Sequence, residues 1–212
     1  MTDSTEHPEN APGGRRERNK ADKRRRIEAA AKELFVHRGF SAVTTHEVAR
    51  RAEVGTGTLF RYAQSKGELL CLVANEEFRD LVGVVPDTGD VVSDFMNLCR
   101  PFLRVLRVQP DNAVAYHRET IFGEPGPHRE EALRILGELR NTISTILSRE
   151  SGRAADDSEI RAAAYTVFDV IYMEIVRAGV NPRTHSNLEA IFRAHIERVV
   201  HGTIPYLTRS GQ

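Results

Sequence analysis

The sequence predicts an all-α protein, and three observations carry that prediction. Apolar residues recur at three- and four-residue spacing along most of the 212 residues, which is the period of an amphipathic helix. Four segments begin with a hydroxyl or carboxylate side chain followed three positions later by glutamate, the capping-box signature of a helix start. These pairs are Thr44 with Glu47, Ser65 with Glu68, Asp156 with Glu159 and Ser186 with Glu189. No segment shows the apolar–polar alternation of a half-buried strand.

The predicted architecture has two helical domains behind a short arm. Residues 1–18 should be a disordered arm, because they are polar and rich in Glu, Pro, Gly and Arg, first acidic and then basic. Residues 19–84 should form an N-terminal three-helix domain, with a helix-turn-helix over residues 44–63, that continues into a long fourth helix. Residues 85–212 should form a second helical domain.

Composition and charge narrow the class of protein. At 40% hydrophobic residues the chain is not disordered throughout, and no stretch approaches the roughly 18 apolar residues of a membrane span. The N-terminal residues lack a secretory signal, so we expect a cytoplasmic protein. Cys71 and Cys99 are too few for a disulfide framework and should be small buried apolar residues.

The formal net charge of zero hides a separation of charge along the chain. Residues 13–66 carry 14 lysines and arginines against 6 acids, whereas residues 67–212 carry 16 against 21. A polyanion such as nucleic acid would therefore be attracted to the N-terminal third of the chain alone.

The basic arm leads into the first helix, which Asn19 or Asp22 can cap and which Gly39 should end. Its apolar stripe consists of Ile27, Ala30, Ala31, Leu34 and Phe35. The cations of the arm are Arg15, Arg16, Arg18, Lys20, Lys23, Arg24, Arg25 and Arg26. They could contact DNA, or they could be a solvated run of charge, and the sequence leaves both interpretations open.

Residues 44–66 have the pattern of two short helices joined by a tight turn and followed by another helix. A small core between the two would be formed by Val48, Ala49, Val54 and Leu59. At the front of the first of them, Thr45 and His46 offer a hydroxyl and free backbone amides to a phosphate. The next helix presents Thr56, Gly57, Thr58, Phe60 and Arg61 near its N-terminal end. This end enters the major groove in helix-turn-helix proteins, where threonine and arginine can read base edges.

On these residues the chain resembles the tetracycline-repressor (TetR) family of bacterial regulators over residues 23–82. The shared motifs are the Thr-Thr helix start, Ala-Arg-Arg-Ala, Gly-Thr-Leu-Phe-Arg-Tyr and Ser-Lys-x-Glu-Leu-Leu. The resemblance implies that Thr45, Tyr62 and Lys66 hold phosphates. It further implies that the residues at or near bases are His46, Thr56, Gly57, Thr58 and Arg61.

The chain departs from the family pattern at four positions. Glu53 stands at the usual turn glycine and costs about 1 kcal/mol or somewhat more if that position needs a positive φ. Gly55 replaces the usual serine cap, Phe60 a common tyrosine and Ala63 a common phenylalanine. These departures concern individual contacts and not the class of motif. Two alternatives remain open: the helix-turn-helix can serve only to pack the domain together, and Tyr62 can simply cover the small core.

The C-terminal helices suggest a dimer. Helical segments are expected at about 90–108, 112–122, 129–149, 157–178 and 187–201. Because the helix over residues 157–178 is apolar almost all round, it must be covered on two sides. In the resembling family the last two long helices of each subunit form a four-helix dimer interface. We therefore expect a homodimer through residues 157–178 and 187–201, with burial inside one monomer as the alternative.

Aromatic and polar residues on the middle helices suggest a cavity for a small hydrophobic effector. The predicted lining is Cys99, Phe102, Tyr116, His117, Phe122, Phe168, Asp169 and Tyr172. Pro101 within a helix suggests a kink that would open such a space. The row Arg100, Arg104 and Arg107 is interpreted as a solvated face.

The function predicted from these features is that of a sequence-specific DNA-binding transcriptional regulator. We expect a ligand-responsive homodimeric repressor that binds a palindromic double-stranded DNA operator. An activator remains an alternative, as does a regulator without a small-molecule effector that is controlled by a protein partner. No catalytic motif, cofactor-binding loop or metal-ligand spacing is found, so we predict neither an enzyme nor a cofactor or metal site.

Overall fold

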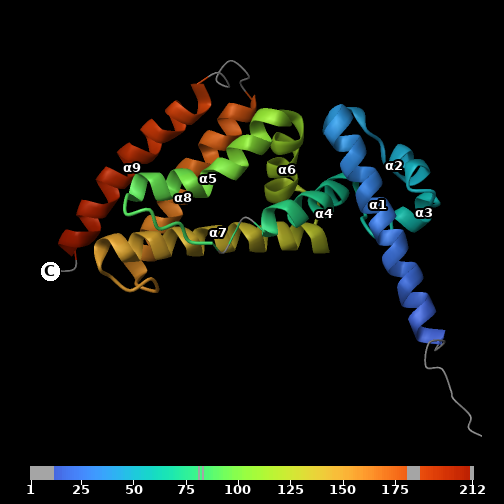
Figure 1. The fold of residues 1–212 in the computed structure, drawn as a ribbon, viewed down its shortest axis with the longest axis horizontal. Coiled ribbons are helices and arrows are strands. Elements are labelled where there is room, and N and C mark those ends of the chain that lie inside the picture. The colour runs from blue at the N-terminus through green and yellow to red at the C-terminus, as the bar shows by residue number, and fades with distance from the viewer. Residues whose placement is uncertain (1–11, 81, 83, 181–186, 211–212) are drawn as a thin grey trace, which may run out of the picture.

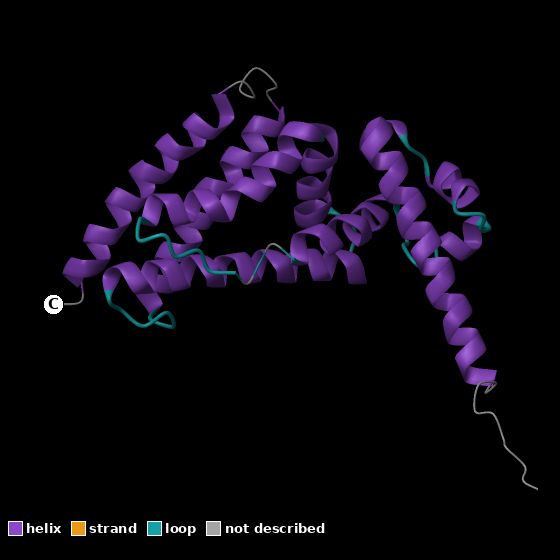
Figure 2. Ribbon diagram, in the orientation of Figure 1, coloured by secondary structure: helices purple, strands orange, loops and turns teal. Residues whose placement is uncertain are grey.

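The computed structural model describes residues 12–80, 82, 84–180 and 187–210. In these residues every regular element is a helix, as predicted (Figure 2). Helices α1 to α3 form a small N-terminal bundle, α4 connects it to the rest, and α5 to α9 form the C-terminal domain (Figure 1). The helices are α1 (Pro12–Ala42), α2 (Thr45–Arg51), α3 (Thr56–Leu59), α4 (Lys66–Arg79), α5 (Val91–Val108), α6 (Pro110–Phe122), α7 (Pro127–Ser151), α8 (Ser158–Val180) and α9 (Leu188–Ser210).

The first helix begins earlier than expected. It starts at Pro12, so Asn19 and Asp22 lie inside the helix instead of capping it, and residues 12–18 are helical rather than part of a disordered arm. Residues 1–11 lie outside the described part. Helical geometry is interrupted at Gly39, whose φ of 76° and ψ of 159° suit glycine, and Phe40 then packs on Phe35 with ring centroids 5.8 Å apart.

The fourth helix ends at Arg79, before the end of the N-terminal domain expected at residue 84. Leu81, expected in its apolar stripe, lies outside the described residues. Most of α4 is nevertheless buried, because α1, α6 and α7 all pack against it. Together with a direct contact of α6 on α1, it joins the N-terminal bundle to the C-terminal domain.

The predicted helix starts are partly confirmed. Thr44 and Glu47 form the complete capping box of α2. Ser65 caps α4 by accepting a bond from the amide of Glu68, but the Glu68 carboxylate bonds elsewhere. At α8 the cap is Asp157 and not Asp156, since the Asp157 carboxylate accepts the amide of Glu159 at 2.8 Å. Ser186 lies outside the described residues.

The C-terminal domain packs α7 against α8 and α8 against α9, with α5 crossing toward α9. The predicted apolar stripe of α8 is buried at Ile160, Ala164, Val167, Ile171 and Ala178. Helix α9 continues to Ser210, past the expected end at residue 201, with Pro205 inside it. None of the described helices is long and apolar enough to cross a membrane.

Candidate nucleic-acid interface and ligand site

Helices α2 and α3 present the predicted base-reading residues to solvent. His46, Gly57, Phe60 and Arg61 are exposed, while Thr45, Thr56 and Thr58 are half-buried. A side chain added at Gly57 would meet nothing within 4 Å, so a DNA backbone or base could approach the helix closely there. Among the described contacts the side chain of Arg61 has neither a hydrogen bond nor an ion pair, which leaves its guanidinium available to a partner.

Glu53, at the turn between α2 and α3, has a φ of 52°. It is the one non-glycine residue with positive φ in the described part of the chain, which confirms that this position favours glycine. Its carboxylate lies 3.6 Å from Arg26 but is 85% exposed, so this ion pair offsets little of the backbone strain.

Lys66 is used inside the protein, contrary to its expected role as a free phosphate clamp. Its Nζ donates to the carbonyls of Phe40 at 2.9 Å and Val43 at 3.0 Å, and it lies 4.2 Å from the centre of the Phe40 ring. Two of its three N–H donors therefore fasten α4 to the end of α1. A phosphate contact through the third donor stays a prediction.

Tyr62 is also engaged. Its hydroxyl donates to the carbonyl of Lys20 at 3.2 Å, and the side chain is half-buried against the small core. Because a phosphate can only accept hydrogen bonds, Tyr62 must release Lys20 before it can hold one. The structure thus favours the alternative in which Tyr62 covers the core.

The basic segment of α1 lies beside this surface as a rigid helix that projects past α2 and α3 (Figure 1). Arg24 pairs with Glu28, and Arg25 and Arg26 pair with Asp22. No ion pair within the described residues involves Arg15, Arg16, Arg18, Lys20 or Lys23, all of which are exposed. These five charges extend the positive surface of the helix-turn-helix.

A junction between the two domains was missed by the sequence analysis. The Glu68 carboxylate, 4% exposed, accepts the backbone amides of Arg129 at 2.8 Å and His128 at 3.4 Å, and so caps α7. The Nε2 of His128 donates to the carbonyl of Tyr62 at 2.7 Å, since a carbonyl can only accept. One end of α7 is therefore bonded both to α4 and to the segment that follows α3.

Asn75 forms the buried centre of this junction. Its amide donates to the carbonyl of His128 at 2.7 Å, and its oxygen accepts the hydroxyl of Tyr116 at 2.9 Å. On the other side of α4, the carboxylate of Asp111 in α6 accepts the amide and the hydroxyl of Ser41, both at 2.8 Å. Helices α6 and α7 are thus both fastened to the DNA-binding domain.

Most of the predicted ligand-site residues come together as a chain of aromatic rings. Phe102 of α5 stacks on Phe78 of α4 at 5.1 Å, and Phe78 contacts Tyr116 of α6 at 4.9 Å. The chain continues through His117 to Tyr172 and Phe168 of α8, at 6.1, 4.6 and 5.4 Å between successive centroids. Phe78 was missed, because its helical stripe predicted only a core position.

Two predicted lining residues are wrong. Phe122 is 84% exposed at the last position of α6, and Asp169 is exposed on the outer face of α8. Asp169 follows the buried Phe168, and consecutive helix residues point about 100° apart, so both cannot face the same neighbours. Cys99 is fully buried, and burial raises the pKa of its thiol to about 12, consistent with a small apolar role.

The aromatic chain contains two unsatisfied polar atoms. Nδ1 of His117 and the hydroxyl of Tyr172 are buried and make no hydrogen bond to any described residue. Burial lowers the pKa of His117 to about 4, so its imidazole is neutral at pH 7. The neighbouring hollow, lined by Phe78 and Tyr116 among others, measures about 40 Å³. It has room for a water molecule, so an effector must open this region further.

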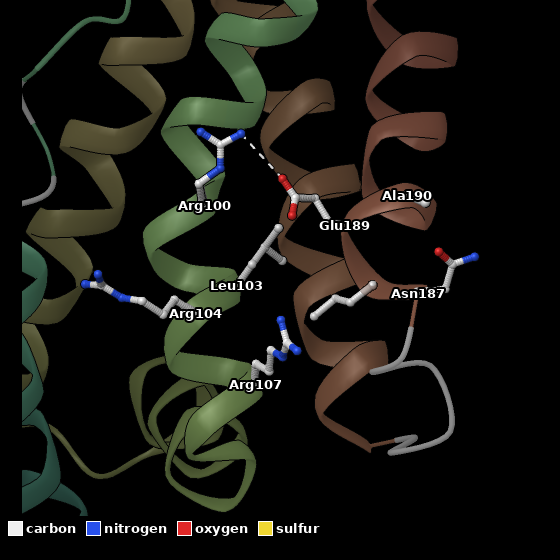
Figure 3. Close-up of a pocket in the computed structure, with 8 residues that line it drawn as sticks. Arg100, Leu103, Arg104, Arg107, Asn187, Glu189 and Ala190 are labelled. Atoms are coloured by element: carbon white, nitrogen blue, oxygen red, sulfur yellow. Dashed lines mark hydrogen bonds and ion pairs between the residues drawn. The ribbon is translucent and has the colours of Figure 1, made fainter.

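The arginine row of α5 lies at the wall of a groove of about 360 Å³ beside the start of α9 (Figure 3). Arg100 pairs there with Glu189 at 3.4 Å, an exposed pair of small energetic value. Arg107 points into the groove, but Arg104 turns to the other side of α5 (Figure 3). The three guanidinium groups do not converge on one point, which agrees with a solvated face.

Known proteins resemble this chain both in sequence and in fold. Residues 27–71 match the family model described as bacterial regulatory proteins, tetR family. The structure of Thermus thermophilus FadR, a TetR-family repressor in complex with lauroyl-CoA, is 26% identical to the chain, covers 84% of it and 94% of its own length, and has a TM-score of 0.60. No curated protein sequence matches the chain.

Two further structures share the fold at lower identity. Bacillus subtilis FadR in complex with stearoyl-CoA is 19% identical, with 84% of this chain and 97% of that chain covered and a TM-score of 0.61. BioQ with its natural double-stranded DNA operator is 22% identical, with 86% and 98% covered and a TM-score of 0.60.

Proposed function

Since this chain belongs to the tetR family of bacterial regulatory proteins, we propose that it is a homodimeric, ligand-responsive repressor that binds a palindromic operator. The observation that carries the proposal is the exposed helix-turn-helix, in which His46, Gly57 and Arg61 face solvent beside cations of α1 that have no ion pair within the described residues. Exposed amides and guanidinium groups on one basic surface suit base edges and phosphates. The related BioQ has been seen with its DNA operator, which supports the same use of the fold here.

The dimer is supported by an exposed face of α8 that carries two large apolar side chains. At helical spacing along it stand Ala162, Tyr165, Thr166, Asp169 and Met173, all exposed. Tyr165 is 54% exposed and Met173 46%, which is unusual for large apolar side chains unless another surface covers them. A second copy related by two-fold symmetry would bury this face and space two recognition helices for two half-sites.

The effector would act through the aromatic chain and the junction. A ligand that separates α6 from α8 displaces Tyr116, and Tyr116 bonds to Asn75, which in turn bonds to the start of α7. Because α7 is bonded to α4 and to the carbonyl of Tyr62, its movement reaches the helix-turn-helix directly. A coupling of about 1–3 kcal/mol between ligand and DNA would be typical. The lauroyl-CoA complex of the Thermus relative supports an effector with an apolar part.

Selection of bound duplexes from a random DNA pool, at near-physiological salt, tests the DNA-binding function. We expect a palindrome whose half-sites lie about one helical turn apart. With the selected operator, Arg61→Ala should weaken specific binding by about 1–3 kcal/mol and relax the preference at one base pair. Recovery of no motif, with binding that disappears as salt rises, would contradict a sequence-specific regulator.

The dimer and the effector are tested separately. Sedimentation should give twice the monomer mass, and Met173→Glu should shift the species to the monomer. Arg104→Glu, which changes an exposed residue of α5 outside the proposed interface, should leave the dimer unchanged. A thermal-shift screen of acyl-CoA thioesters and other apolar metabolites should identify ligands that stabilise the protein and release the operator. A ligand that stabilises the protein without changing its affinity for DNA would exclude the regulatory role of that ligand.

A further inference from the structure

The two unsatisfied atoms in the aromatic chain indicate which chemical group an effector carries. Nδ1 of His117 and the hydroxyl of Tyr172 belong to rings that meet edge to face, with centroids 4.6 Å apart. They come from different helices, α6 and α8, so a group inserted between these two helices can contact both side chains. Leaving each polar atom buried without a partner costs about 1–3 kcal/mol, which a suitable group would recover.

The surroundings of the pair are apolar on most sides. Phe168 stacks on Tyr172 at 5.4 Å, and Tyr116 lies at 6.1 Å from His117. Both His117 and Tyr172 are only half-buried as whole residues, although their polar atoms are covered. The surrounding rings offer surfaces against which an apolar body can pack.

The protonation of the two side chains restricts the ligand group. A neutral imidazole has one donor and one acceptor nitrogen, and Nδ1 can be either, whereas the tyrosine hydroxyl can donate or accept. A carboxylate can only accept hydrogen bonds, so it satisfies both atoms only when Nδ1 and the Tyr172 hydroxyl both donate. An ammonium group can only donate, so it satisfies both atoms only when both accept. A hydroxyl group can donate to Nδ1 while accepting from Tyr172, or can accept from both.

We propose that the site between α6 and α8 binds an apolar molecule through one neutral hydroxyl group, an alcohol or a phenol, held between His117 Nδ1 and the Tyr172 hydroxyl. This names the ligand class for the effector site of the proposed function and rests on that function only for its regulatory consequence. Burial lowers the pKa of His117 to about 4, so the ring stays uncharged and does not attract an anion at pH 7.

The test uses probes in matched pairs that differ only by a hydroxyl in place of a methyl group: p-cresol with p-xylene, and 1-hexanol with heptane. Binding to the full-length protein is measured by calorimetry and by the ¹⁵N shift of the His117 imidazole. We expect at least one hydroxyl probe to bind at least tenfold more tightly than its methyl partner and to move the Nδ1 resonance. If neither pair shows this preference, the site is filled by ordered water alone and the proposal is overturned.

Two variants localise the binding. Tyr172→Phe should remove the preference for the hydroxyl probe while retaining the apolar contacts. Tyr206→Phe, which changes an exposed tyrosine of α9, should leave the preference unchanged. A preference that survives in Tyr172→Phe would place the probe elsewhere and overturn the assignment. These binding measurements contain no DNA, so they test the site apart from its regulatory role. A hydroxyl probe that binds here but does not release an operator in a separate DNA-binding assay would contradict the regulatory function and leave the site intact.

Discussion

The two domains of this protein place their functional residues in opposite environments. In the N-terminal domain the candidate DNA contacts are exposed, and residues 13–66 carry 14 lysines and arginines against 6 acids. In the C-terminal domain the candidate ligand contacts form a largely buried chain of rings, within a segment where acids outnumber bases. A surface that binds a polyanion needs only the right residues facing outward, whereas a cavity depends on how several helices pack. The junction around Asn75 decides whether these two environments act independently.

The largest effect is expected from breaking the junction. Asn75→Ala removes the partners of the Tyr116 hydroxyl and of the His128 carbonyl, and should lower the free energy of unfolding by about 2–3 kcal/mol. Denaturant unfolding monitored by circular dichroism measures the change. Glu76→Ala, at the next position but exposed, is the matched control and should change it by less than about 0.5 kcal/mol. Two separate transitions, with only one affected, would show that the domains unfold independently.

The buried histidine makes the C-terminal domain sensitive to acid. Burial lowers the pKa of His117 from 6.5 to about 4, so between these pH values the unfolded chain binds a proton that the folded chain does not. Stability therefore falls as the pH is lowered through this window, by about 2–3 kcal/mol for this group. His117→Phe should flatten the pH dependence of unfolding between pH 6.5 and 4. His37→Gln, which changes an exposed histidine of α1, should leave that dependence as it is.

A variant of Lys66 tests whether the cations of the N-terminal surface are available to DNA or are used in bonds within the protein. Lys66→Met removes two bonds to the carbonyls of Phe40 and Val43, and should lower the free energy of unfolding by about 1–2 kcal/mol. Arg61→Ala, which has no such bonds, should weaken DNA binding without this loss of stability. The salt dependence of operator binding then decides the remaining role: a slope reduced by about 0.9 assigns the third N–H of Lys66 to a phosphate. An unchanged slope confines Lys66 to its internal contacts.

The sequence predicted the N-terminal domain in more detail because its signals are local. Thr44 and Glu47 cap α2 within four residues, and the small core of the motif lies within one short segment. What it missed there involves partners distant in sequence, such as Lys20 for the Tyr62 hydroxyl and His128 for the Tyr62 carbonyl. The family resemblance implied phosphate contacts for Tyr62 and Lys66, whose side chains are already bonded within the fold.

In the C-terminal domain helical periodicity predicted which residues are buried, but it did not predict which residues of other helices they contact. Phe102, Tyr116, His117, Phe168 and Tyr172 do form one chain, yet Phe78 of α4 completes it from a helix assigned to the other domain. Phe122 could not be placed because it is the last residue of α6, where the helical period no longer tells inside from outside. The number and order of helices followed from local patterns, whereas the junction depended on tertiary packing.

The smallest effect concerns Glu53, at the turn where the family resemblance implies a glycine. A non-glycine residue at a φ of 52° is strained by about 1–2 kcal/mol, and glycine loses about 0.5–1 kcal/mol more conformational entropy on folding. Glu53→Gly should therefore stabilise the protein by about 0.5–1 kcal/mol, whereas Glu53→Ala, which keeps the strain, should not. Thermal unfolding of both variants measures the difference. Equal stability of the two would mean that the turn relaxes around Glu53, and that the geometry of α2 against α3 is set by the small core between them.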